Sequence, residues 1–367
     1  MPFARAKVEL EELLGIHLST ATIRRQTLQA GEGCEQVQLQ RAHPLNPSPE
    51  EKPAERMIIS NDGAMVSLRG KVWGEVKLVV LGHVQIRESK KGPEVQSHKL
   101  SYFARLATAE TFTDQASAEV RRRGLHRAKE VCAVHDGAEW IPRMVQAHRY
   151  DALCILDFPH AAERLTAIAH FLEESASPLP KQWLQEHLHQ LKHEGPEEIL
   201  KELNEVSERV GRPEGIEEHL RYLSKRVEQM QYPSYRAASW PIGSGIVESG
   251  HKVVMQARLK GAGMHWKPEN VNPMLALCCA RFNHRLNEEW QDQHDWNQRR
   301  RHQIRKRRFQ TRRALQESKR EELRVLVHPP VVAVKEEIIA PKKSGRTPAQ
   351  HRWGRQTFSP RMLRQGS

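Results

Sequence analysis

Three acidic residues, far apart in the chain, stand in settings that suit divalent-metal chemistry. Glu248 lies in WPIGSGIVESGHK, just after a turn rich in Pro, Gly and Ser and near the start of an expected helix. Asp62 in IISNDGAMV and Asp136 in VCAVHDGAEW each precede a glycine at the expected end of a strand. Mg²⁺ and Mn²⁺ prefer carboxylate oxygens, and two such ions about 3.5–4 Å apart can activate an attacking oxygen and stabilise a leaving one. The pattern predicts a two-ion site for phosphoryl transfer.

Each of these acids also has a simpler explanation. Asp-Gly pairs are common in turns, and a glutamate in the first turn of a helix is stabilised by the helix dipole. Taken singly, a turn explains Asp62 or Asp136 better than a metal does, and the dipole explains Glu248 equally well. The order in which the three acids follow the expected strands and helix favours the metal site.

Asp157 and His160, in LDFPHA, follow an expected strand next to the one that ends at Asp136. They are candidate accessory residues of the same cleft, with His160 near a scissile phosphate or a base. A capping aspartate and a buried histidine are an equal alternative.

The five cysteines are odd in number and unevenly spread, which is typical of a reducing compartment and not of a disulfide framework. Cys132 and Cys154, each followed by a histidine, superficially match zinc spacing. Both fall within apolar strands, so we expect them in the core. Cys278 and Cys279 lie in an apolar helix and are expected there too.

Positive charge is concentrated late in the chain. The protein has 58 Lys and Arg against 45 Asp and Glu, a net charge of +13, and residues 299–325 hold 12 basic and 3 acidic residues. Clustering of this kind favours a phosphate backbone as partner over an ordinary basic protein. The candidate DNA contacts here are Arg299, Arg300, Arg301, Arg305, Arg307 and Arg308.

Further basic residues, Lys252, Arg258 and Lys260, follow Glu248 directly. They would meet substrate phosphates if that helix lines the cleft, although a solvated helix face explains them equally well. Trp240 and Trp266 flank the segment, and packing in the core or in a lid is favoured over base stacking.

The N-terminal elements resemble a helix-turn-helix. Residues 1–30 predict two short helices, separated by a turn with a glycine, and the second exposes Arg24, Arg25 and Gln26 as candidate DNA contacts. An ordinary helical hairpin is the alternative. Residues 31–55 are rich in Pro, Glu and Gln and predict a linker.

The middle of the chain predicts an α/β fold. Three antiparallel strands are followed by a helix, a strand, a crossover and a strand parallel to the one before, an order typical of a ribonuclease-H-like mixed sheet. The expected strands are residues 57–66, 72–86, 99–107, 129–136 and 151–158. The expected units are a catalytic core in 56–177 and 236–290, an inserted all-helical subdomain in 178–235, a basic helix in 291–327 and a flexible basic tail in 328–367.

Three segments carry a resemblance to a known family: DGAMVSLRGKVWGEVK, DGAEWI with ILDFPHAAERL, and YPSYRAASWPIGSGIVESGHKVVMQARLKGAGMHW. They resemble the Kra-type insertion-sequence transposases, bacterial DDE enzymes that are distantly similar to the Mutator-like group. The match runs from about Asp62 to Trp266 and resumes weakly near GRTPAQHRW. Its specific part is GSG-x-VE with the following KxxxxxRxKGxGMxW.

The resemblance implies a catalytic, metal-binding triad of Asp62, Asp136 and Glu248 on a ribonuclease-H-like fold, with two Mg²⁺ ions or Mn²⁺ in their place. It implies terminal inverted repeats and target DNA as partners, and a homodimer or larger assembly on DNA. Asp157 and His160 match an accompanying motif. More chain is expected before such a helix-turn-helix, so residues 1–30 are read as the later part of a DNA-binding region.

The expected function is therefore DNA transposition: cleavage of phosphodiesters at the element's ends and strand transfer into target DNA. Two alternatives are a non-catalytic DNA-binding protein, such as a decayed or repurposed copy, and a nuclease of RNA or hybrids that cuts without joining. No apolar run approaches the ~18 residues of a membrane span, and the N-terminus lacks a signal-peptide core. We therefore expect a cytoplasmic protein associated with the nucleoid.

Overall fold

The computed structural model describes residues 2–43, 52, 54–90, 92–175 and 179–327. The chain forms two units, Met1–Gln303 and Ile304–Ser367. The expected tail, 328–367, lies outside the described residues. No helix of the described part is both long and apolar enough to cross a membrane.

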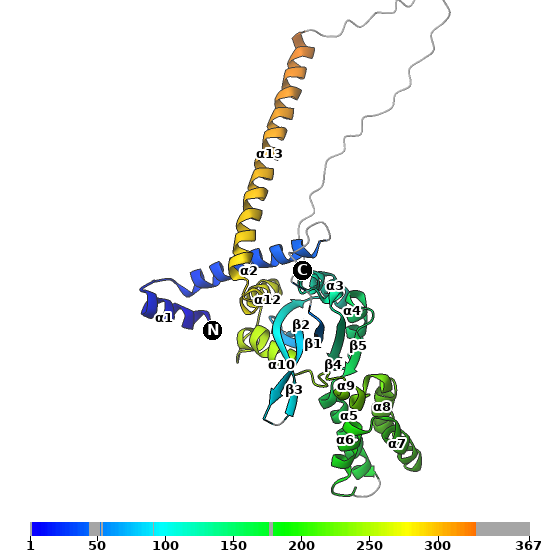
Figure 1. The fold of residues 1–367 in the computed structure, drawn as a ribbon. Coiled ribbons are helices and arrows are strands. Elements are labelled where there is room, and N and C mark those ends of the chain that lie inside the picture. The colour runs from blue at the N-terminus through cyan, green and yellow to red at the C-terminus, as the bar shows by residue number, and fades with distance from the viewer. Residues whose placement is uncertain (1, 44–51, 53, 91, 176–178, 328–367) are drawn as a thin grey trace, which may run out of the picture. The chain divides into compact units, whose positions relative to one another are not determined.

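An open mixed sheet forms the centre of the first unit (Figure 1). Within the described residues it has five strands in the order β3-β2-β1-β4-β5. β1 pairs antiparallel with β2 and β2 with β3, whereas β4 runs parallel to both β1 and β5. The strands are Arg56–Leu68, Val72–Ser89, Gly92–Leu106, Glu130–His135 and Leu153–Leu156. The predicted α/β class, the antiparallel meander and the parallel last pair are confirmed.

Both faces of the sheet are buried, so the central strands are almost continuously apolar. Successive side chains of a strand point to opposite faces. Met57 and Ile59 of β1 join a cluster with helices α3, Ala109–Arg122, and α4, Trp140–His148. Ile58 joins the opposite cluster, which includes helix α5, Phe158–Ser175. The same alternation determines the face of the sheet to which an acidic residue of β1 projects.

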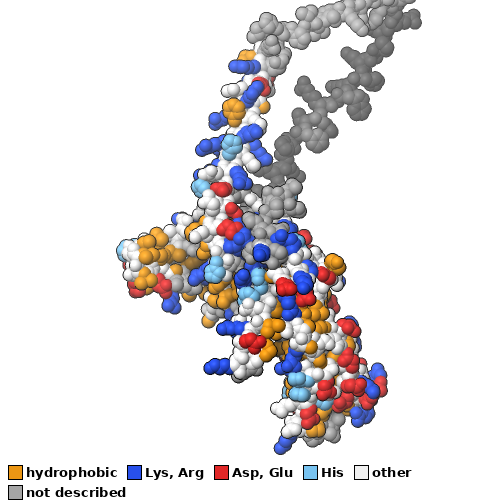
Figure 2. All heavy atoms as spheres, in the orientation of Figure 1, with side chains coloured by type: hydrophobic (Ala, Val, Ile, Leu, Met, Phe, Trp, Pro, Cys, Tyr) orange, Lys and Arg blue, Asp and Glu red, His pale blue; other side chains and the backbone are white. Residues whose placement is uncertain are grey.

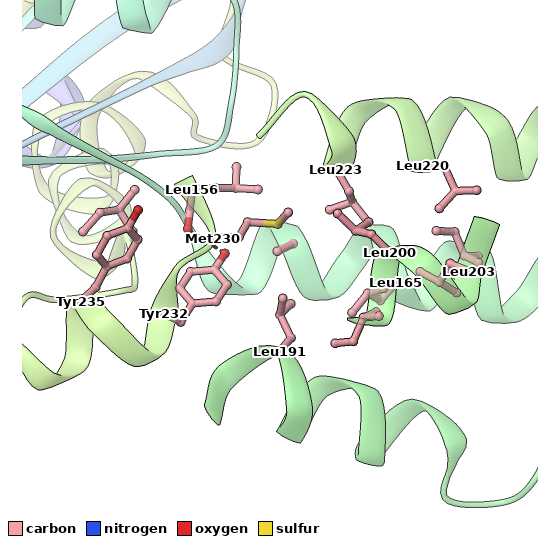
Figure 3. Close-up of a cluster of buried hydrophobic side chains, with 14 of the residues drawn as sticks. Leu156, Leu165, Leu191, Leu200, Leu203, Leu220, Leu223, Met230, Tyr232 and Tyr235 are labelled. Atoms are coloured by element: carbon pink, nitrogen blue, oxygen red, sulfur yellow. Dashed lines mark hydrogen bonds between the residues drawn. The ribbon is translucent and has the colours of Figure 1, made fainter. Parts of the chain in front are cut away.

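The helical insertion has its own apolar centre. Leu191, Leu200 and Leu220 come from three different helices and turn toward one another (Figure 3). The same cluster continues through Leu156 of β5 and Leu165 of α5, so the insertion packs directly on the sheet layer. Its helices are α6, Trp183–His193; α7, Glu197–Arg209; α8, Glu214–Ser224; the short η2, Val227–Gln229; and α9, Tyr232–Ala237. The prediction of an all-helical segment over 178–235 is confirmed for residues 179–235.

The end of α1 and the start of α2 agree with the predicted turn that contains a glycine. α1, Phe3–Leu14, ends at Gly15, whose φ of 63° lies in the left-handed region that glycine favours. Ser19 caps α2 by accepting a hydrogen bond from the Thr22 amide at 3.0 Å. Arg24, Arg25 and Gln26 on α2 are exposed.

The linker predicted over 31–55 is wrong for residues 31–42, because α2 is one continuous helix, Thr20–Ala42. It packs along α12, Pro268–Phe282, and its backbone comes so close that a Cβ on Gly31 would lie 2.3 Å from the Pro273 carbonyl oxygen. This tertiary contact outweighs the poor local helix propensity of the glycines. Residues 44–51 and 53 of the predicted linker lie outside the described residues.

The contact between α2 and α12 gives a stability prediction. Gly31→Ala should lower the free energy of unfolding by about 1–3 kcal/mol, because the new methyl group meets backbone that cannot move aside. Gly33→Ala is the matched control, since its Cβ would meet only the flexible end of Gln293, and the gain in helix propensity of up to about 1 kcal/mol should offset that contact. Urea unfolding of both variants checks the difference. Equal effects would show that close approach does not explain Gly31.

A buried polar network joins α2, β3 and α13, Leu286–Val327. The fully buried Arg105 guanidinium donates to Gln38 Oε1 at 2.6 Å and to the Ala104 carbonyl at 2.7 Å. The Gln38 amide in turn donates to both carboxylate oxygens of Glu289 at 2.9 Å. The first turn of α13 thus belongs to this packed region, which explains why the helix begins before the predicted residue 291.

Candidate active site

Strand register brings two of the three predicted acids together. Asn61 of β1 pairs with His135 of β4 across a parallel ladder, so the residues that follow them, Asp62 and Asp136, are neighbours at the end of that ladder. By the alternation of a strand, Asp62 projects to the same face as Ile58. This face is covered by α5 and by α10, Gly245–Gly250. The two carboxylates therefore share one side of the sheet.

The two acids differ in their backbone setting. β4 ends at His135, and Gly137 turns the chain with a φ of 84°, as predicted for Asp136. The prediction that Asp62 ends its strand and begins a turn is wrong, because β1 continues to Leu68. The strand continues since β2 still pairs with it after β4 has ended.

The electrostatics of the pair favour a bound cation. Burial raises the pKa of the Asp136 carboxyl, and the neighbouring Asp62 carboxylate raises it further, while a hydrogen bond from the Ala138 amide opposes the rise. Two carboxylates that repel each other in this way are stabilised by a divalent cation between them.

Glu248 lies in the first turn of α10, as predicted, and is exposed. Three residues later His251 is buried, and its Nε2 lies 2.9 Å from Asp62 Oδ2, at ion-pair distance but not aligned for a hydrogen bond. Residues three apart share a helix face, so Glu248 lies on the side of the helix that faces Asp62. Within the described ranges, however, no three Asp, Glu, His or Cys side chains converge closely enough to hold a metal ion as they stand.

The backbone around His251 has an unusual form. A π-helical stretch, η3, runs over His251–Gln256 directly after α10, and widened turns of this kind are common at functional sites. At Gly250 the helix lies so close to β2 that a Cβ would be 2.8 Å from Val80 Cγ2. His251 was not among the predicted site residues; its spacing from Glu248 in ESGHK is the signal that could have identified it.

Asp157 connects β5 to the turn before α10. It is fully buried, its Oδ1 accepts from the Ser244 amide at 2.7 Å, and its Oδ2 lies 2.6 Å from His160 Nδ1. The next residue, Phe158, donates its amide to the Ile242 carbonyl at 2.9 Å. Asp157 therefore fixes the approach to the Glu248 helix and is too buried to meet a substrate.

His160 is half-buried beside this aspartate. The hydrogen bond to Asp157 raises the pKa of His160, and the charge on Asp136 contributes in the same direction. The imidazolium form is therefore favoured close to the paired carboxylates, where it could approach an anionic group.

A titration can test this role of Asp157. In Asp157→Asn the carboxylate charge and its hydrogen bond to the ring are lost, so we expect the pKa of His160 to fall. NMR titration of the His160 ring protons measures the shift. In the control variant His170→Gln, the signals of the other histidine on α5 disappear, which separates them from those of His160. An unchanged titration would contradict the assigned pairing.

The helical insertion holds the loop after Asp136. The Tyr222 hydroxyl of α8 donates to the Asp136 carbonyl, and the Arg226 guanidinium donates to the Gly137 carbonyl at 2.6 Å. A Cβ on Gly137 would lie 2.2 Å from the Tyr222 oxygen. These partners stand 86 and 89 positions from the loop in sequence, and no local pattern indicates them.

Two groups of predicted DNA contacts remain, one in residues 252–260 and one on α13. Lys252 and Lys260 are exposed, whereas Arg258 is half-buried, with its guanidinium 4.2 Å from the Phe3 ring centre and 5.2 Å from that of Trp266. Arg258 is thus part of a packed wall. On α13, which Figure 2 shows lined by basic side chains, Arg299, Arg301, Arg305, Arg307 and Arg308 are exposed, and the side chain of Arg300 lies outside the described part.

The two predicted tryptophans and two of the four predicted core cysteines take the expected places. Trp240 and Trp266 are buried, which confirms packing over base stacking. All five cysteines lie in the described ranges and are free; Cys132 and Cys279 are buried in the core as predicted, whereas Cys154 and Cys278 are only partly buried against it.

A comparison with known protein families finds no family model that matches this chain, and a search of curated proteins finds no match either.

Proposed function

We propose that this protein is a metal-dependent DNA transposase with a ribonuclease-H-like catalytic core. The observation that carries the proposal is the pairing of Asn61 with His135, because it places Asp62 and Asp136 side by side at the end of a parallel ladder. The strand order, with three antiparallel strands followed by two parallel ones, supports the fold assignment.

The residues present suit divalent ions in part. Asp62 and Asp136 offer oxygen ligands of the kind that Mg²⁺ and Mn²⁺ prefer. A cation bound between them would relieve their mutual repulsion. Glu248, exposed on the adjoining helix α10, is the third ligand that we propose. When bound, two divalent ions supply the Lewis acidity that activates the attacking oxygen and stabilises the leaving one.

The chain's own groups hold and orient the DNA strand. Asp157 fixes the turn before α10, and His160, whose pKa the hydrogen bond to Asp157 raises, is the group that we assign to the scissile phosphate. In the first step the oxygen of water bonds to phosphorus at an element end and the 3′-oxygen leaves. In the second step that 3′-hydroxyl attacks a target phosphodiester, whose own 3′-oxygen leaves. Each step exchanges one P–O bond for another, so no further energy source is needed.

DNA is the proposed partner, both as the terminal inverted repeats and as the target. The exposed basic residues of α2 and α13, together with Lys252 of η3 and Lys260, are the contacts that we assign to its phosphates. Two element ends must be cut and joined to the same target DNA, which calls for two copies of the protein. A homodimer or larger assembly on DNA therefore belongs to the proposal.

A non-catalytic DNA-binding protein is the second candidate. The exposure of Glu248 favours it, because the third carboxylate does not close on the other two. The same basic residues would then bind DNA without chemistry.

Oligonucleotides that carry the inverted repeats flanking the gene separate these functions. A transposase should cleave them at the end of the repeat only with Mg²⁺ or Mn²⁺ and should join the freed 3′-end to a target duplex. Binding that never leads to cleavage would establish the non-catalytic protein. Cutting of RNA or hybrids without any joined product would establish a nuclease.

A further inference from the structure

A basic cavity separate from the paired carboxylates lies where α1, α2 and the segment after α11, Ala257–Leu259, come together. Its volume is about 550 Å³, within the usual range for small-ligand sites. The polar side chains that line it are Arg24, Arg69, Arg258, His265, Lys267 and Asn270. Within the described residues the lining includes no Asp or Glu, so the cavity is built for an anion.

The wall of the cavity is held firmly to the sheet. Trp266 donates its amide to the Ser67 carbonyl at 3.0 Å and accepts from the Arg69 amide at 2.8 Å, which extends β1 pairing into this segment. The indole Nε1 donates to the Leu259 carbonyl at 3.2 Å, and His265 Nδ1 lies 2.7 Å from the Ser67 hydroxyl. The backbone segments that carry Arg69 and Lys267 are therefore held together before any ligand arrives, while both side chains stay exposed.

One donor in this wall lacks a partner. Arg258 Nη2 is buried, yet no hydrogen-bond acceptor within the described residues reaches it. Burial lowers the pKa of Arg258, whose guanidinium packs on Phe3 and Trp266, so Arg258 adds positive potential to the cavity from within its wall. Glu269, 3.4 Å from Lys267, is exposed, and solvent screens its charge.

The apolar part of the lining points to the kind of anion. Phe3, Leu28, Met264 and Trp266 stand beside the cationic groups. A bare phosphate needs only the cations, whereas a nucleotide needs cations for its phosphate and apolar or aromatic surface for its base. The mixed lining therefore suits a nucleotide better than an inorganic ion.

We propose that this cavity binds one unpaired nucleotide of a DNA strand, with its phosphate on Arg24, Arg69 and Lys267 and its base against Phe3 and Met264. This second site rests on the proposed function in one respect, namely that DNA is the partner. It would hold the strand at a point separate from the carboxylates at which the strand is cut.

Binding measured without divalent metal tests the site apart from cleavage. We would titrate a labelled single-stranded oligonucleotide in EDTA and follow fluorescence anisotropy at several salt concentrations. Arg69→Glu and Lys267→Glu should each weaken binding about tenfold and reduce the slope of log affinity against log salt by about one. Arg209→Glu, an exposed arginine on the helical insertion, is the matched control and should change neither quantity at this site.

A variant that fills the cavity without changing charge makes the test specific. Asn270→Trp, on α12, should weaken single-stranded binding as much as the charge reversals do, with less effect on duplex. If Asn270→Trp binds normally while the charge reversals do not, DNA crosses the surface outside the cavity and the proposal is overturned. If inorganic phosphate competes as well as a deoxynucleoside monophosphate, the cavity is a bare anion site and the base assignment fails. Loss of cleavage in variants of the carboxylates leaves these results unaffected, so the two proposals fail separately.

Discussion

Asp62→Asn should lower the rate of Mg²⁺-dependent DNA cleavage by roughly 10³-fold or more while DNA affinity stays within about twofold. The amide removes one of the two charges that Asp62 and Asp136 place at the end of the parallel ladder. No phosphate contact is assigned to this side chain, so binding should persist. Single-turnover cleavage of an end oligonucleotide, together with anisotropy binding, measures both quantities.

Matched variants make this result interpretable. Asp136→Asn and Glu248→Gln should behave like Asp62→Asn, whereas Asp114→Asn, an exposed aspartate on α3, should cleave normally. The folded state of Asp62→Asn should keep its stability, because relief of the repulsion with Asp136 offsets the lost charge beside His251. Full cleavage by a triple variant of the three acids in Mg²⁺ would refute the proposed chemistry.

Glu289→Ala should destabilise the protein by about 3–5 kcal/mol, the usual cost of removing one partner of a buried charged pair. Gln38 would lose both of its acceptors on Glu289, and the fully buried Arg105 would lose the carboxylate at the end of that relay. The free energy of unfolding from urea titration measures the loss.

Two further variants show whether burial is the cause. Glu288→Ala removes the adjacent, partly exposed carboxylate that pairs with Arg41 and Arg122, and it should cost only about 1 kcal/mol. The double variant Arg105→Met with Glu289→Leu should recover much of the loss, because no unpaired charge then remains in the core. A double variant less stable than Glu289→Ala would contradict this account.

The sheet could be predicted from the sequence because its signals are local. Runs of β-branched residues and the glycines between them indicated all five strands, and chain order then indicated which pairs are antiparallel and which parallel. The helical insertion was equally visible from its periodic leucines. The apolar residues around Cys132 and Cys279 likewise indicated that these two lie in the core.

The rest depended on contacts between distant parts of the chain. Residues 31–42 are helical because α2 packs on α12, more than 200 residues away. The length of β1 beyond Asp62 is set by its pairing with β2. His251 meets Asp62 of β1, and Tyr222 and Arg226 meet the loop after Asp136, only in the folded chain.

The clamp that Tyr222 and Arg226 place on the Asp136 loop has a consequence for protein engineering. Cutting out residues 178–235 and splicing the ends would release two carbonyl groups from their donors and uncover the apolar side of β5. A trimmed version could not keep that loop in its present shape. Any minimal derivative of this protein therefore has to retain both the insertion and the sheet.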